Sequence, residues 1–129
     1  QLKEAIGFLQ KTARIYEKYQ LTQILEAVYA ELCHCYALLE DWESAIRYAR
    51  KGLDYAQSKR HLLGGYLEIA QLYALQKEWK QAEKWVHKAY QFACSPEGSD
   101  ELKLLFNETF GGLQQRFSPL RELSFENTD

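Results

Sequence analysis

Apolar residues follow the spacing of amphipathic helices along most of the chain. Between residues 26 and 57, a first apolar stripe has the i, i+3, i+4, i+7 spacing of a helix with one buried face, and it consists of Tyr29, Leu32, Cys33 and Tyr36. A break at Glu40-Asp41 follows, where the Asp41 side chain can cap the next helix. A second stripe then contains Trp42, Ala45, Ile46, Ala49 and Leu53. We therefore predict two antiparallel helices in this part of the chain.

The same pattern returns at a constant distance of 37 residues, which is the distance from Trp42 to Trp79. Aromatic, alanine and lysine positions match at this distance without a gap, as in Tyr29 with Tyr66, Tyr36 with Tyr73, Ala45 with Ala82, Lys51 with Lys88 and Ala56 with Ala93. Self-similarity at such a period is typical of proteins built from stacked repeats. The predicted fold class is therefore all-α, with antiparallel helix-turn-helix repeats.

Helical patterns also flank the two repeats. Residues 1–19 are predicted to be the second helix of a partial repeat, with Ala5, Leu9, Thr12 and Ala13 as its packing residues. Residues 100–117 are predicted to form either a capping helix or the first helix of a further repeat, with Ser99 or Asp100 as its cap. Residues 118–129 are predicted to be a poorly ordered tail. In all we expect about six helices in a single domain, residues 1–129, with full repeats at residues 22–57 and 60–94.

These positions resemble the tetratricopeptide repeat, whose motif is W-x2-L-G-x2-Y, then A-x3-F, then P. The first copy reads Tyr29-x2-Leu32-Cys33-x2-Tyr36 and Ala45-x3-Ala49, and the second reads Tyr66-x2-Ile69-Ala70-x2-Tyr73 and Ala82-x3-Val86. Glu40 or Lys77 stands where the family has a glycine before the second helix, and no proline closes either copy. Each repeat is about three residues longer than the family's usual 34, as in repeats of bacterial signalling and regulatory proteins. The resemblance implies a short right-handed α-solenoid.

The resemblance also implies a function in binding proteins or peptides, because the first helix of each pair lines a concave groove in this family. Carried over residue by residue, the expected groove contacts are Ala27, Ala30, His34, Leu38, Leu67, Gln71 and Leu75. Such a lining is small and mostly apolar, with His34 and Gln71 as hydrogen-bonding groups. It would suit an amphipathic helix or an apolar peptide bound by a larger scaffold or regulatory protein. Alternatively, another part of the same protein fills this groove.

A structural role is the second hypothesis. The chain would then be an oligomerisation or interdomain spacer segment of a larger helical-repeat protein. The N-terminal helix, together with Phe106, Phe110 and Phe117, would bury its apolar surface against a second copy or against further repeats. Because the chain contains no methionine and begins within a helical pattern, we expect it to be a piece of a longer protein.

Charge and composition narrow the classes of partner. With 16 basic and 18 acidic residues the net charge is −2, which gives no bulk electrostatic reason to expect nucleic acid as a partner. A ladder of Arg47, Lys51, Lys84 and Lys88 is expected to lie on a solvated outer face. No apolar run approaches the roughly 18 residues that a membrane span needs, so no membrane partner is expected. Three cysteines without a disulfide framework favour a reducing compartment, and we predict a cytoplasmic location.

Cys33-His34-Cys35 has the residue types of a metal site but not the geometry. Two residues two positions apart on a helix point about 200° apart, so Cys33 and Cys35 cannot hold one ion together, and zinc needs about four converging ligands. Cys33 also occupies a position that Ala70 fills in the second copy, which indicates packing. The chain lacks nucleophile-elbow, phosphate-loop and zinc-protease motifs. We therefore predict no metal, no cofactor and no enzymatic activity.

Overall fold

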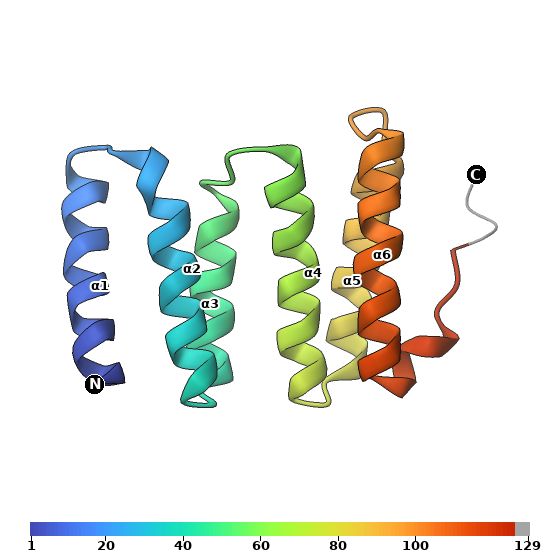
Figure 1. Ribbon diagram of the computed structural model, residues 1–129, viewed down its shortest axis with the longest axis horizontal. Helices are drawn as coiled ribbons and strands as arrows, with labels where there is room; N and C mark the ends of the chain where they lie inside the picture. Colours follow the sequence, from blue (N-terminus) through green and yellow to red (C-terminus); the bar gives the residue numbers. More distant parts are fainter. Residues whose placement is uncertain (126–129) are drawn as a thin grey trace. The chain divides into compact units, whose positions relative to one another are not determined.

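The computed structural model describes residues 1–125 and is all-α over this part of the chain, as the sequence predicts (Figure 1). Over these residues there are six α-helices, one short 3-10 helix and no strand. Their bounds are α1 Leu2–Lys18, α2 Thr22–Leu38, α3 Trp42–Leu53, α4 Lys59–Leu75, α5 Trp79–Cys94, α6 Asp100–Arg116 and η1 Ser118–Glu122. None of the described helices combines the length and the apolar character that crossing a membrane requires. The handedness of the solenoid stays a prediction.

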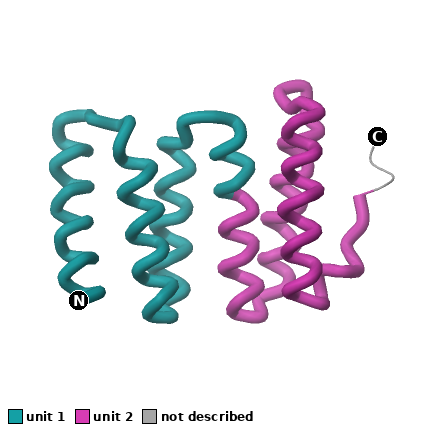
Figure 2. Tube along the Cα trace, in the orientation of Figure 1, with its two compact units in different colours: residues 1–65 teal, residues 66–129 magenta. Residues whose placement is uncertain are grey.

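The chain divides into two compact units, residues 1–65 and residues 66–129, with the boundary inside α4 (Figure 2). Unit 1 contains α1, α2, α3 and the beginning of α4, and unit 2 contains the rest of α4 together with α5, α6 and η1. Each unit is described separately below. The single domain that the sequence predicts stays a prediction.

In unit 1, α2 packs against both α1 and α3. This position explains why α2 buries residues on more than one side: the predicted stripe residues Tyr29, Leu32 and Cys33 are buried, and so is Cys35. An added Cβ at Gly65 would lie 2.4 Å from Cδ2 of Leu53, so glycine here leaves room for the end of that side chain.

The 37-residue period of the sequence is also a period of side-chain packing. In unit 1 the Tyr29 ring lies 6.0 Å from Tyr48 and 5.8 Å from Tyr55. In unit 2 the three positions 37 residues later repeat this cluster, because Tyr66 lies 6.0 Å from Trp85 and 5.9 Å from Phe92. Each copy therefore builds the same small aromatic core, as expected for true structural repeats.

A lysine completes each of these two aromatic clusters. Nζ of Lys51 lies 5.6 Å from the Tyr48 ring centre, and Nζ of Lys88, 37 residues later, lies 4.8 Å from the Trp85 ring centre. Both lysines are exposed, as predicted for the basic ladder, but they also make cation–π contacts. Part of the ladder is thus a packing feature of the repeat.

Three helices end in the same turn, and in each the turn residue has left-handed backbone geometry. Gln20, Glu40 and Lys77 have φ values of 56°, 57° and 63°. In each turn the next amide donates to the carbonyl five residues back, as from Asp41 N to Tyr36 O at 3.0 Å, which is the Schellman pattern. Glu40 and Lys77 thus adopt the left-handed geometry that glycine usually supplies after a helix.

The turn after α1 belongs to this same type, since Leu21 N donates to Tyr16 O at 2.8 Å. The connection from α3 to α4 differs: Asp54 remains in right-handed geometry. The end of α1 thus matches the turns inside the two repeats rather than the connection between them. That α1 is the second helix of a partial repeat stays a prediction.

Side-chain caps are present at both helix starts where the sequence predicts them. The Asp41 side chain accepts from Ser44 N at 3.2 Å at the start of α3, and Ser99 Oγ accepts from Leu102 N at 3.1 Å at the start of α6. Glu78, which is equivalent to Asp41 in the second copy, makes no side-chain cap bond. Its longer side chain is a poor substitute for the short caps that reach the N3 amide.

Unit 2 corrects the prediction of a poorly ordered tail. After α6, residues 118–122 form η1, and Leu120 is fully buried against the helices. Phe125 stacks on Tyr90 with ring centres 4.4 Å apart. This short stretch packs on unit 2 because Leu120, Leu123 and Phe125 supply apolar surface that is removed from water there. Residues 126–129 of the predicted tail lie outside the described residues.

Candidate functional site

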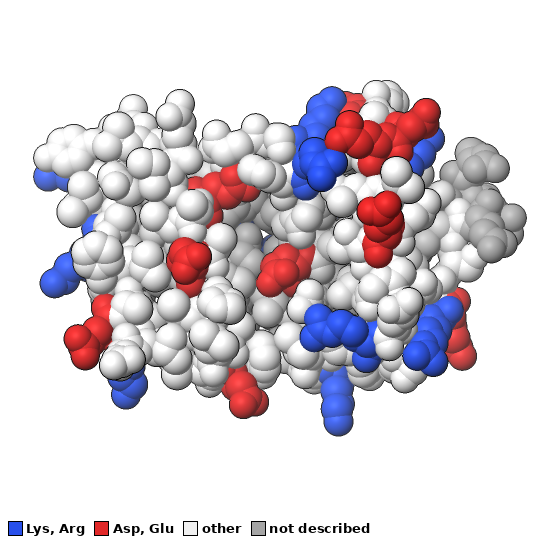
Figure 3. Space-filling model, in the orientation of Figure 1, with Lys and Arg blue, Asp and Glu red and all other residues white. Residues whose placement is uncertain are grey.

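The α2 half of the predicted groove lies on one exposed face of that helix. The predicted contacts in α2 are all exposed, namely Ala27, Ala30, His34 and Leu38. They remain accessible because α1 and α3 cover other sides of α2. Leu38 is 58% exposed and Ile24, one turn before Ala27, is 47% exposed. On the face that Figure 3 shows, the surface over α2 is largely uncharged apart from scattered acidic side chains.

The α4 half of the predicted groove differs from the expectation. Leu67 is only 2% exposed, so it has almost no surface to offer a ligand, and we remove it from the candidate site. Its position on the helix makes it a core residue rather than a lining residue. Gln71 is half-buried and Leu75 is exposed. Since these α4 residues belong to unit 2 and the α2 residues to unit 1, a continuous groove formed by both stays a prediction.

The three side chains of Cys33-His34-Cys35 differ in burial, and this difference separates their roles. Cys33 and Cys35 are both buried, which confirms the packing role of Cys33, while His34 is exposed between them. Within residues 1–125 no group of three histidine, cysteine or acidic side chains is placed to hold a metal ion. His34 thus remains a candidate contact on the α2 face.

A hydrogen-bonded link at the edge of α2 is a feature that sequence reasoning missed. Oε1 of Glu26 accepts from Gln57 N at 3.2 Å and lies 3.1 Å from Nδ1 of His61. The link ties the connection between α3 and α4 to α2. Because Glu26 is 31 positions from Gln57 and 35 positions from His61, only the fold brings it to them.

A second exposed apolar face lies on α1. Phe8 is 70% exposed, Tyr19 is 64% exposed and Ile15 is 53% exposed. With Ala5 and Thr12 they follow the alternating spacing of four and three residues that forms the seam of a coiled coil. Sequence reasoning placed the packing side of α1 at Ala5, Leu9, Thr12 and Ala13. Of these four Ala13 is buried, Leu9 and Thr12 are half-buried, and Ala5 is exposed.

The phenylalanines of α6 are less accessible than the hypothesis of self-association supposed. Phe106 and Phe110 are buried inside unit 2, and Phe117 is half-buried. The rings of Phe106 and Phe110 pack against Phe125, whose ring centre lies 5.7 Å from each. Surface for a second copy is therefore available on α1 but not at Phe106 and Phe110.

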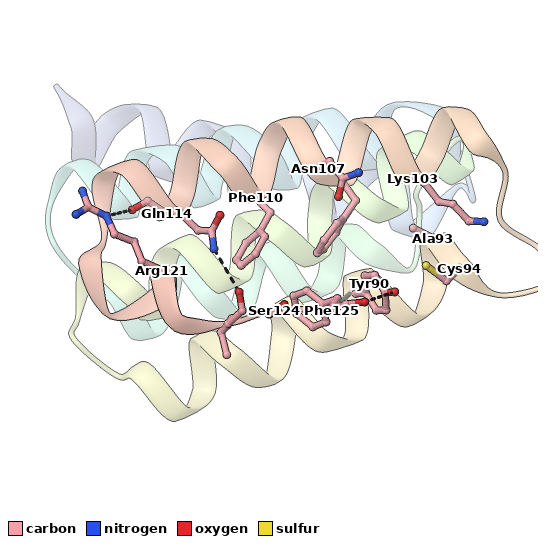
Figure 4. Close-up of a pocket in the computed structure, with 12 residues that line it drawn as sticks. Tyr90, Ala93, Cys94, Lys103, Asn107, Phe110, Gln114, Arg121, Ser124 and Phe125 are labelled. Atoms are coloured by element: carbon pink, nitrogen blue, oxygen red, sulfur yellow. Dashed lines mark hydrogen bonds between the residues drawn. The ribbon is translucent and has the colours of Figure 1, made fainter. Parts of the chain in front are cut away.

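Unit 2 also contains a cavity of about 660 Å³ between α5, α6 and the segment that follows α6 (Figure 4). Its walls combine aromatic rings with polar side chains, namely Tyr90, Ala93, Cys94, Lys103, Phe106, Asn107, Phe110, Gln114, Arg121, Leu123, Ser124 and Phe125. This volume is in the range of small-molecule and peptide-anchor pockets. Sequence reasoning missed this cavity, because residues 121–125 form one wall and were expected to be poorly ordered.

Comparison of the chain with protein-family models, with curated proteins and with solved structures gives no match in any of the three. The resemblance to the tetratricopeptide repeat therefore stays a prediction that rests on the motif residues. The repeated aromatic clusters and turns described above are the structural features that accompany those residues.

Proposed function

We propose that the chain is a non-enzymatic, tetratricopeptide-like module that binds a protein or peptide through the exposed face of α2. The observation that carries this proposal is the exposed row of Ala27, Ala30, His34 and Leu38 on a helix whose other sides are packed. In its cellular setting the module acts as part of a cytoplasmic scaffold or regulatory protein.

The chemistry of the α2 face fits a helix or an apolar peptide. Ala27 and Ala30 leave room for a partner backbone to approach closely, while Ile24 and Leu38 supply apolar area. Each Å² of apolar surface removed from water contributes roughly 25 cal/mol. His34 adds a hydrogen-bonding group that can fix orientation.

The test changes the α2 face and a matched position elsewhere. We expect the double variant Ala30→Glu, Leu38→Asp to lose its partner in a quantitative affinity capture, with at least about a tenfold drop in recovery. Both positions are exposed, so the helical circular dichroism spectrum should stay the same. Lys84→Glu, at an exposed position on α5, is the control and should capture the partner normally. Capture that survives the double change refutes the α2 assignment.

The α1 face favours a second candidate function, namely self-association. Phe8, Ile15 and Tyr19 form an exposed seam, and Glu4, Lys11 and Lys18 lie along one flank of it. An antiparallel second copy of α1 would place Glu4 of one chain opposite Lys18 of the other, so that opposite charges face each other across the seam. The runner-up role as an oligomerisation segment thus rests on α1.

Sedimentation velocity measures this second function directly. The wild-type chain should show a sedimentation coefficient that rises with concentration, and the double variant Phe8→Glu, Ile15→Glu should abolish that rise. Arg14→Glu, an exposed change on α1 outside the seam, is the control. A wild-type chain that stays monomeric at every concentration excludes self-association through α1.

A further inference from the structure

The segment after α6 lies on unit 2 in the manner of a bound peptide. Residues 123–125 have no regular secondary structure, and they follow η1 along the faces of α5 and α6. Leu120 fills a fully buried position at one end of the segment, and Phe125 inserts its ring at the other. The end of η1 and residues 123–124 join these two apolar anchors, which hold the segment on unit 2.

Phe125 enters a pocket made of aromatic side chains. Its ring stacks on Tyr90 at 4.4 Å and meets Phe106 and Phe110 edge-on, both at 5.7 Å. His87 closes another side, with ring centres 4.9 Å apart. Aromatic pairs at these distances add attraction beyond simple area burial. The site therefore selects for an aromatic side chain at this position.

The other contacts hold the main chain of the segment rather than its side chains. Tyr90 Oη donates to the carbonyl of Phe125 at 2.9 Å. The Gln114 amide donates to the carbonyls of Leu120 at 3.1 Å and of Leu123 at 3.4 Å. Any extended peptide presents carbonyl groups in this way. These bonds would therefore accept a different sequence that carries the same apolar anchors.

The segment fills this site incompletely. A cavity of about 660 Å³ remains beside Phe125. In Figure 4, Gln114 and Arg121 lie at one end of the cavity, and Lys103 and Cys94 lie at the other, beyond the Phe125 ring. Lys103 is exposed at that far end. Its ammonium group suits a carboxylate.

We propose that the α5–α6 face of unit 2 is a docking site for a short peptide of another protein, with the segment 118–125 as its tethered occupant. The peptide carries a leucine, then an aromatic anchor five residues later, then an acidic residue. The first two features are those of Leu120 and Phe125, and the acidic residue is the complement of Lys103. This site is separate from the α2 face, so it does not depend on the function proposed above.

A fluorescent peptide with the sequence of residues 118–129, SPLRELSFENTD, tests the proposal by fluorescence anisotropy against the full chain. The wild-type chain should bind it weakly, because its own segment competes at high effective concentration. The chain variant Phe125→Ala loses that anchor, and it should bind the same peptide at least about tenfold more tightly. A peptide with alanine in place of its phenylalanine should bind neither chain. Equal affinity of both chains for the unchanged peptide overturns the proposal.

Three further changes, made in the Phe125→Ala chain, show whether the peptide is bound at this folded site. In the Phe125→Ala background, Lys103→Glu should lower the affinity for the peptide by about fivefold or more. Tyr90→Phe keeps the aromatic ring and should lower this affinity about threefold. Lys84→Glu, an exposed change on α5 outside the cavity, should leave the affinity unchanged. If Lys84→Glu weakens binding as much as Lys103→Glu, peptide binding is nonspecific and the site is refuted.

Sedimentation distinguishes the two possible sources of the peptide. Identical sedimentation of the wild-type chain and its Phe125→Ala variant shows that the segment occupies the site of its own chain, as the proposal requires. If instead the wild-type chain is a dimer that the free peptide converts to a monomer, the occupant is the segment of a second copy. That result overturns the assignment to another protein.

Discussion

The two units differ in whether the apolar face of a helix is covered by other residues. In unit 1, α1 packs on α2 and leaves Phe8, Ile15 and Tyr19 exposed. In unit 2, α6 packs on α5, and a short stretch of the following chain then covers Phe106 and Phe110. Each of these helices thus packs on one α-helix of its unit.

This difference shows that the pattern of a helix does not decide whether its apolar face stays open. A covering segment of about eight residues, with two apolar anchors, is enough to bury the face of α6. The α1 face has no such cover among residues 1–125 and is free to receive a partner. Unit 2 gains its cover within the chain, so its stability should depend on a few residues of that segment.

The largest expected effect comes from removing the anchor of this cover. Leu120→Ala deletes a fully buried side chain, and large-to-small changes at such positions lower the free energy of unfolding by about 2–4 kcal/mol. Thermal unfolding followed by circular dichroism should show a clear fall in melting temperature.

Ile15→Ala provides the matched change in unit 1. It removes a side chain of the same size, but this side chain is 53% exposed, so the free energy of unfolding should change by less than about 0.5 kcal/mol. Equal losses for the two variants would mean that the cover of unit 2 adds no more stability than the open face of unit 1.

The helices and two of their caps could be predicted because they follow from local rules. Periodic apolar stripes set the positions of all six helices, and the short polar side chains of Asp41 and Ser99 mark two of the starts. The repeat of 37 residues predicted that the aromatic positions of the two copies would be equivalent, and the ring clusters of Tyr29 and Tyr66 show that they are.

The remaining features depend on which neighbour covers which face, and periodicity carries no information about that. In α1, the stripe through Ile6 and Ala13 is buried on α2, and the competing stripe through Phe8 and Ile15 stays open. Leu67 was assigned to the groove by position in the motif, but burial placed it in the core. The cover of unit 2 escaped prediction because a short, irregular segment has no periodic signal.

A change of intermediate size in unfolding free energy is expected at the start of α3 but not at the equivalent start of α5. Asp41→Ala removes the cap bond to Ser44 N and should cost about 1 kcal/mol of unfolding free energy. Glu78→Ala occupies the same place in the second copy, where no side-chain cap bond exists. Its effect should stay within about 0.5 kcal/mol, and chemical denaturation measures both. A loss at Glu78 as large as that at Asp41 would show that the local helix dipole, rather than the hydrogen bond, stabilises these starts.

The smallest expected effect is a gain of stability at the left-handed turns. Glu40 has a φ of 57° and Lys77 has a φ of 63°, a geometry that disfavours residues with a Cβ and suits glycine. Glu40→Gly in unit 1 and Lys77→Gly in unit 2 should each raise the free energy of unfolding by about 0.5–1 kcal/mol. Because the two turns share the same hydrogen bonds, Asp41 N to Tyr36 O and Glu78 N to Tyr73 O, both 3.0 Å, the two gains should be equal. Unequal gains would mean that the units differ in their turns as well as in the cover of their outer faces, since the local strain released by glycine is the same in both.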